Sequence, residues 1–173
     1  LPEGRVKQRV GPMDDAASLS LIAIHAHGIP DEFNDATIKE ALAAKPVTLG
    51  KRTDLRGLPL LTIDPADARD RDDAIWAAAD DDPKNKGGWQ VIVAIADVAH
   101  YVTHGSALDK EARKRGNSVY FPDRVVPMLP HELSSDLCSL HENVDRPVMA
   151  VQMWFDAEGN KLRHKFMRGL IRS

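Results

Sequence analysis

The sequence predicts an α+β fold: a mixed, mainly antiparallel sheet with flanking helices, preceded by a short helical linker region. Apolar residues recur at helical spacing in the first part of the chain, whereas after Gly57 they alternate or form short runs. Expected strands follow one another across short loops, which implies antiparallel pairing. The chain has 173 residues, 43% of them hydrophobic, so one core of useful size can form.

Two helices are expected before the sheet. The first covers residues 16–28, with Asp14 or Asp15 as its cap and a glycine at its end. The second extends from residue 34 or 35 to residue 44 and stops before a proline. Residues 45–57 are polar, with two glycines and a proline, which indicates a linker.

The later elements are predicted from strand-like and helix-like runs between turn residues. Loops rich in Asp, Asn and Gly separate the two expected strand pairs, as in hairpins. The elements, in order, are a short apolar stretch at 58–63, strands at 74–79 and 89–98, a helix at 108–115, an extended segment at 117–121, and strands at 148–155 and 161–171.

Charge is distributed unevenly along the chain. The net charge of −3 argues against a uniformly basic domain that binds nucleic acid. Acids nevertheless gather in residues 64–82, and residues 161–172 carry basic groups without an acid. This distribution fits a protein that holds cations at one place and phosphates around it, although a solvated surface would also explain it.

The sequence also favours a cytoplasmic protein. It contains no apolar run of about 20 residues that would cross a membrane, and its first residues do not have the pattern of a signal peptide. The single cysteine, Cys138, cannot form an internal disulfide, which fits a reducing compartment. We expect Cys138 to be a small buried residue and not a nucleophile.

The segment TIDPADARDRDDAI, residues 62–75, carries the candidate site. It contains Asp64, Asp70, Asp72 and Asp73. Carboxylates this close raise one another's pKa unless cations or water neutralise them. Magnesium takes oxygen ligands, and two ions about 3.5–4 Å apart would match four carboxylates. The segment must bend for all four to converge, and Pro65 favours a turn after Asp64.

A solvated loop or an incidental calcium site is the alternative interpretation of this segment. Apolar runs flank it on both sides, so it is expected where core strands end. It also lacks the ligand spacing of a helix–loop–helix calcium site. Both features favour the metal-dependent interpretation.

The segment resembles the active-site signature of the ribonuclease II/ribonuclease R family, whose catalytic domain is called RNB. The likeness continues through WQVIVAIADVAHYV, LDKEARKRGNSVYFPDRVVPMLP and HELSSDLCSLHENVDRPVMAVQM, and it is closest to the bacterial ribonuclease R type. It implies that residues 55–173 are the N-terminal half of an RNB exoribonuclease domain. Residues 1–54 resemble the end of a cold-shock-like RNA-binding region and its linker.

The resemblance implies a magnesium-dependent hydrolytic 3′-to-5′ exoribonuclease, with manganese as the alternative metal. Its substrate would be a single-stranded RNA 3′ end, and its products nucleoside 5′-monophosphates. By the same likeness Asp64, Asp70, Asp72 and Asp73 are the catalytic and metal-binding residues. Asp64 and Asp73 resemble direct ligands, Asp70 completes or orients the site, and Asp72 matches the residue whose loss is most damaging. Tyr120 matches an aromatic residue that stacks on the last base.

The sequence departs from the family in three respects. It does not contain the later arginine and glutamate of the catalytic domain, nor the flanking RNA-binding barrels. We therefore expect a fragment that is inactive alone and works with other domains of the full-length chain. Arg71 stands where relatives commonly have an apolar residue, so it either weakens the site or points outward. A non-catalytic RNA-binding relative is the alternative function, and the basic run 110–115 is either a helix face or an RNA contact.

Overall fold

A five-stranded sheet forms the centre of the structure, a computed structural model that describes residues 3–6, 11–12 and 15–173. The sheet has the strand order β1-β7-β6-β3-β2, and a separate two-stranded sheet joins β4 to β5. The elements are α1 (Ala16–Ala26), α2 (Asp35–Ala43), β1 (Thr53–Asp54), β2 (Asp73–Ala79), η1 (Pro83–Asn85), β3 (Trp89–Ala96), α3 (Val98–Tyr101), α4 (Ala107–Arg115), β4 (Val119–Tyr120), β5 (Val125–Val126), η2 (Leu133–Leu137), β6 (Asp145–Phe155) and β7 (Lys161–Arg172).

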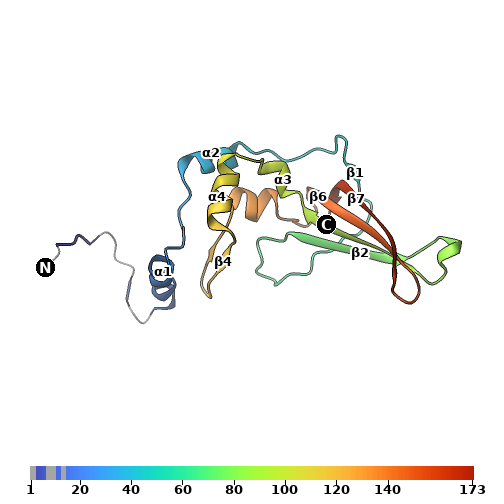
Figure 1. Ribbon diagram of the computed structural model, residues 1–173, viewed down its shortest axis with the longest axis horizontal. Helices are drawn as coiled ribbons and strands as arrows, with labels where there is room; N and C mark the ends of the chain where they lie inside the picture. Colours follow the sequence, from blue (N-terminus) through green and yellow to red (C-terminus); the bar gives the residue numbers. More distant parts are fainter. Residues whose placement is uncertain (1–2, 7–10, 13–14) are drawn as a thin grey trace.

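The predicted α+β class is confirmed. Strands β2, β3, β6 and β7 pair antiparallel in the large sheet, and only the short β1 pairs parallel, with β7. The two expected hairpins are β2–β3 and β6–β7. Figure 1 shows the helices gathered toward one end of the sheet, while the turns of both hairpins lie at the other end.

The N-terminal helices begin and end close to the predicted positions because of local capping. Asp15 caps α1 by accepting a hydrogen bond from the Ser18 amide at 3.1 Å, while Asp14 lies outside the described residues. Gly28 has a φ of +63° after the helix, a conformation that glycine adopts without strain. Asn34 caps α2 in the same way. No helix in the described part of the chain has both the length and the apolar character that crossing a bilayer requires.

Strand β3 is shorter than predicted. It was expected to reach Val98, but it ends at Ala96, and Val98 begins the single turn of α3. The Asp97 amide donates to the Pro147 carbonyl at 2.9 Å, and the buried Asp97 carboxylate faces Arg52. The strand ends before Asp97, whose buried carboxylate needs a cationic partner that the strand itself does not supply.

The expected linker and the apolar stretch after it are partly built into the sheet. Thr53 pairs with Gly169 in the parallel β1–β7 contact. Leu61, in the expected stretch 58–63, forms a single antiparallel bridge with Ile75 of β2. The side chain of Leu55 lies so close to Gly169 that a Cβ there would be 2.7 Å from its Cδ1 atom, which explains the glycine.

One face of the sheet packs against the helices to form the core. Strand residues such as Ala94 and Val148 are fully buried against Leu108 of α4 and Leu133 of η2. Ala41 of α2 belongs to the same core. Helix α2 is therefore packed on the sheet domain. The domain division at residue 54 and the likeness of residues 1–54 to a cold-shock region stay predictions.

Arg115, at the end of α4, connects the N-terminal segment to the rest of the molecule. Its guanidinium lies 3.7 Å from the centroid of the Phe33 ring and donates to the carbonyl oxygens of Pro30 at 2.7 Å and Pro127 at 3.2 Å. It also pairs with Glu111 at 3.1 Å, and both side chains are buried. The end of the basic run is thus structural and not an exposed helix face.

We expect Arg115→Ala to destabilise the protein by about 3 kcal/mol, because the change leaves the buried Glu111 carboxylate with only the exposed Lys114 ammonium, 4.0 Å away, as its charge partner. The matched control is Arg113→Ala on the exposed side of α4, which should change the free energy of unfolding by less than about 0.5 kcal/mol. Urea unfolding of both variants measures the difference. Equal effects would show that Arg115 is not the connection described here.

Candidate active site

The four aspartates of the sequence signature lie in one loop, residues 62–73, here called the aspartate loop. Leu61 and Ile75 close its base, since each amide donates to the other's carbonyl at 2.9 Å. The Ala68 amide donates to the Pro65 carbonyl at 2.9 Å, so the turn expected after Asp64 is present. The chain therefore leaves the sheet edge, turns back and re-enters it at Asp73, the first residue of β2.

The second half of the aspartate loop is held from two sides. The Ala96 amide, at the end of β3, donates to the Asp72 carbonyl at 2.8 Å. On the other side, the Leu140 amide donates to the Arg71 carbonyl at 2.7 Å, and the Arg71 amide donates to Ser139 Oγ at 3.2 Å. These bonds fix the backbone that carries Asp72 and Asp73 between β3 and the segment after η2.

The carboxyl groups of the loop influence one another electrostatically. Partial burial raises the pKa of Asp72, and the negative charges of Asp73, Asp70 and Asp64 raise it further. Asp64 Oδ2 is buried and has no hydrogen-bond partner within the residues that the structure describes. A buried carboxylate oxygen without a partner is costly, so it is a position where a cation would fit.

Tyr120 reaches the aspartate loop from the β4–β5 hairpin. Its hydroxyl donates to Asp70 Oδ2 at 2.5 Å, although 64% of the residue's surface is exposed. The bond to an anionic acceptor favours the neutral phenol and raises the pKa of Tyr120 to about 12. Its ring is thus free to contact another molecule while its hydroxyl stays beside the acids.

The hairpin that carries Tyr120 is also attached to the N-terminal helix. Ser20 of α1 donates to Asp123 in the turn of the hairpin, and Arg124 donates to the Ala17 carbonyl at 3.2 Å. In Figure 1 the hairpin lies between α1 and the loop that precedes β2. Helix α1 therefore supports the hairpin whose Tyr120 contacts Asp70.

The sequence patterns did not predict the buried ion pair that lies beside the aspartate loop. The Asp97 carboxylate lies 2.7 Å from Arg52 and 3.4 Å from Arg168 of β7. Asp97 follows directly after Ala96, whose amide holds Asp72, so the ion pair supports the same backbone. The signal in the sequence was an acid directly after a run of apolar strand residues, but only the fold brings the two arginines to it.

The structure also shows the surroundings of Cys138 and Arg71, two other residues singled out in the sequence. Cys138 is buried, and burial raises the pKa of its thiol to about 12, which agrees with the expected small core residue. The Arg71 side chain makes no ion pair with a carboxylate among the described residues. It therefore does not neutralise the aspartates.

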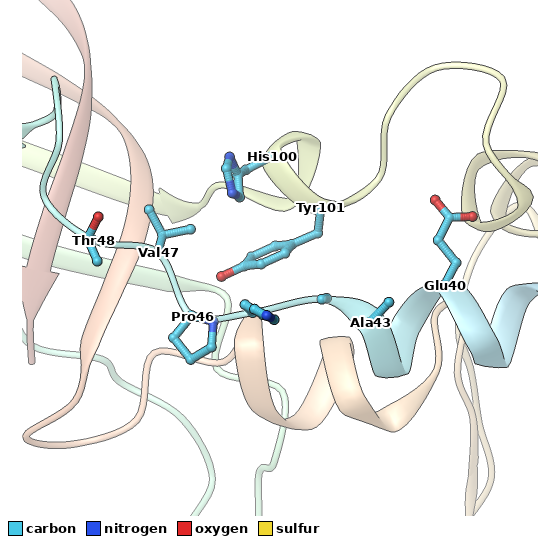
Figure 2. A pocket seen from close by; sticks show the side chains of 9 residues that line it. Glu40, Ala43, Pro46, Val47, Thr48, His100 and Tyr101 are labelled. Atoms are coloured by element: carbon cyan, nitrogen blue, oxygen red, sulfur yellow. The ribbon is translucent and has the colours of Figure 1, made fainter.

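The hollow in Figure 2 is separate from the aspartates. It has a volume of about 550 Å³ and lies between the linker after α2 and the short helix α3. Tyr101 points its hydroxyl toward Pro46 and Val47, and this buried oxygen has no partner among the described residues. None of the four aspartates lines the hollow.

The four aspartates are not preassembled as a metal site. In the described ranges, no three His, Cys, Asp or Glu side chains converge closely enough to hold a metal ion. The donor set still fits magnesium, since it consists of carboxylate oxygens and includes the unpartnered Asp64 Oδ2. The predicted metal ligands Asp64, Asp70, Asp72 and Asp73 stay a prediction.

Comparison with known protein families shows to which family this chain belongs. Residues 52–173 match the RNB domain. The chain belongs to the RNB domain family. This confirms the resemblance seen in the sequence, and the RNB match includes the aspartate loop, Asp97 and Tyr120.

The ribonuclease R relatives compared with it are longer than this chain. Ribonuclease R of Acidithiobacillus ferrooxidans is 46% identical over 177 residues, a match that covers all of this chain and 39% of that protein. The structure of Mycoplasma genitalium RNase R in complex with double-stranded RNA matches with a TM-score of 0.88 and 35% identity, covering 96% of this chain and 30% of that one. This RNB chain thus spans less than half of either relative.

A more distant structure shares only the fold. Yeast Ssd1, described as a pseudonuclease, matches this RNB chain with a TM-score of 0.64 and 20% identity over 73% of its length. Because a fold can be kept without a given chemistry, the function must be argued from the aspartates themselves.

The raised pKa of Asp72 predicts a stability that depends on pH. A folded-state pKa above the unfolded value means that the folded chain binds more protons, so stability falls as pH rises through the interval between the two values. At neutral pH the metal-free Asp72→Asn protein should therefore melt at a higher temperature than the wild type. Below the unfolded pKa of Asp72 this advantage should disappear.

Thermal melts in a chelator at neutral and acidic pH measure this effect. Asp81→Asn, in the exposed loop before β3, is the matched control and should leave the melting temperature nearly unchanged. If the Asp72→Asn protein melts at a lower temperature than the wild type at neutral pH, the charge of Asp72 does not destabilise the folded protein.

Proposed function

We propose that the full-length protein is a magnesium-dependent exoribonuclease that hydrolyses RNA from the 3′ end to nucleoside 5′-monophosphates. The present chain supplies the acidic part of its catalytic site. Support comes from the RNB domain match and from the ribonuclease R relatives. The observation that carries the proposal is the aspartate loop, which carries all four aspartates and leaves a buried oxygen of Asp64 without a partner among the described residues.

The roles proposed for the aspartates are those that the family resemblance implies, and their surroundings support them. We assign Asp64 and Asp73 as direct metal ligands, since Asp64 has an unpartnered buried oxygen and Asp73 is exposed at the start of β2. Asp70 completes the site while it accepts the hydrogen bond from Tyr120. Asp72, fixed by its backbone bond to Ala96, acts on the reacting phosphate group and its attacking water.

Bound magnesium, or manganese in its place, would supply charge stabilisation at the scissile phosphate and a water of lowered pKa. The protein's contribution is to carry four carboxylates on one loop whose backbone is held by β3 and by the segment after η2. The ion pair of Asp97 with Arg52 keeps the end of β3 in position and thereby the backbone of Asp72.

Tyr120 is proposed to stack on the last base of a single-stranded 3′ end. Its ring is exposed and its hydroxyl is anchored to Asp70, so a base on the ring would place the terminal phosphate near the acids. Stacking tolerates any base, because every base has a flat aromatic face. This suits an enzyme that degrades RNA without regard to sequence.

The proposal includes dependence on the rest of the full-length chain. This chain covers 39% of one Ribonuclease R relative and 30% of the solved RNase R chain. We expect the 173-residue piece to be inactive alone, because the remaining residues of the catalytic domain and the RNA-binding domains are needed. A cytoplasmic location and the absence of a membrane partner belong to the same proposal.

Asp72→Asn in the full-length protein should lower the rate of RNA hydrolysis by at least about 100-fold, as expected when a group that acts on the reacting centre is lost. Asp81→Asn, which removes one carboxylate outside the site, should leave the rate unchanged. Release of nucleoside monophosphates from 3′-labelled RNA in magnesium measures both.

Equal rates for Asp72→Asn and wild type would remove the catalytic assignment. If the wild type binds RNA but releases no nucleotide with either metal, the non-catalytic RNA-binding alternative holds.

Replacing Tyr120 separates stacking from hydrogen bonding. Tyr120→Ala should weaken binding of a single-stranded RNA 3′ end by about 10-fold or more, since stacking on an aromatic ring contributes about 1–3 kcal/mol per base. Tyr120→Phe keeps the ring and loses the bond to Asp70, so it should bind RNA nearly as tightly as wild type. Fluorescence anisotropy in calcium, without hydrolysis, measures the affinities. Similar losses in both variants would assign Tyr120 to positioning Asp70 instead of stacking.

A further inference from the structure

The backbone from Asp70 to Asp73 consists of successive peptide groups that each have a hydrogen-bond partner outside the aspartate loop. The groups on either side of Asp72 accept bonds through their carbonyl oxygens from backbone amides of neighbouring segments. The group that joins Asp70 to Arg71 differs, because its N–H donates to a side chain, the hydroxyl of Ser139, at 3.2 Å. Among these bonds, the one to Ser139 is therefore the one that a side-chain substitution can remove while the backbone stays intact.

Ser139 is itself held firmly in the core. It is fully buried, its amide donates to the Asp136 carbonyl at 2.8 Å, and its carbonyl accepts from Arg146 Nε at 2.9 Å. Arg146 is only 5% exposed, and its second contact is a bond of 2.7 Å to the Asp136 carboxylate. Because both backbone groups of Ser139 are bonded, its hydroxyl oxygen is an acceptor at a fixed place.

The direction of a side chain follows from the two peptide planes that flank its Cα atom, since each plane is rigid and only two soft dihedral angles lie between them. The plane that Ser139 holds is the one after the Cα atom of Asp70. The same carboxylate accepts the hydrogen bond from Tyr120 at its other end. Asp70, which is exposed, is thus fixed through its backbone by Ser139 and through its side chain by Tyr120.

We propose that Ser139 is a positioning residue for the acidic site, acting through the Arg71 amide on the direction of Asp70. Arg146 in turn positions Ser139. The inference deepens the proposed function and rests on it, because it assigns a further residue to the same reaction. It also accounts for Arg71: both of the bonds that this residue makes to Ser139 and Leu140 belong to its backbone. Any side chain except proline, which lacks the N–H group, can therefore stand at this position.

Kinetics of the full-length protein test the inference. Ser139→Ala removes the acceptor, and Ser106→Ala is the matched control, since Ser106 Oγ accepts from the Asp109 amide at the same 3.2 Å but caps α4. We expect Ser139→Ala to lower kcat on single-stranded RNA by about 10-fold and to change KM by less than about 2-fold, because a misplaced group at the reacting centre slows the chemical step. Ser106→Ala should keep the wild-type kcat.

Amide hydrogen exchange of the full-length protein without RNA measures the contact independently of activity. In a peptide that contains Arg71, Ser139→Ala should exchange one amide at least about 10-fold faster than the wild type, because that amide has lost its partner. The same peptide in Ser106→Ala should exchange as in the wild type.

A kcat of Ser139→Ala equal to that of Ser106→Ala would overturn the inference. So would a lower kcat with unchanged exchange at Arg71, since the effect would then not pass through the aspartate loop. If Ser139→Ala fails to fold, Ser139→Cys gives the same comparison, because it keeps the volume of the side chain and offers only a weak sulfur acceptor.

The two measurements also separate this inference from the proposed function. An inactive wild type in which Ser139→Ala still accelerates exchange at Arg71 would contradict the proposed function alone, because the contact exists without the chemistry. An active wild type with unchanged kcat and exchange in Ser139→Ala would contradict this inference alone.

Discussion

Mutual repulsion of four carboxylates is the constraint on which the arrangement of this chain depends. Left free, a segment with Asp64, Asp70, Asp72 and Asp73 would spread its charges into solvent. The Leu61–Ile75 pairing closes the base of the loop, and the Ala96 amide holds Asp72 by its carbonyl. The folding energy of the sheet thereby offsets the cost of this arrangement: partial burial, and after it the negative charges of the other three aspartates, raise the pKa of Asp72.

The rest of the structure supports that loop from a distance. Arg115 attaches the N-terminal segment to α4, and α1 contacts the hairpin that brings Tyr120 to Asp70. Asp97, paired with Arg52, ends β3 at the position where Ala96 can hold Asp72. The aspartates are thus held in position by contacts between residues far apart in the sequence, and not by the aspartate loop alone.

Membership of the RNB domain family identifies the fold, whereas the arrangement of the aspartates bears on catalysis. The fold is shared with a protein named RNase R and with one described as a pseudonuclease, so architecture alone does not specify hydrolysis. In this chain the observation that bears on chemistry is the aspartate loop with its buried, unpartnered Asp64 oxygen among the described residues.

The sequence by itself determined the α+β class, the two hairpins and the four aspartates, and it narrowed the helix starts to Asp14 or Asp15 and to Asn34 or Asp35. These follow from local rules: spacing of apolar residues, capping groups and turn residues act within a few positions. Only the tertiary structure decided that β3 stops at Ala96, that Leu61 closes the loop, and that Tyr120 meets Asp70. Each of those depends on a partner beyond the reach of local patterns, such as Asp70, which is 50 positions from Tyr120.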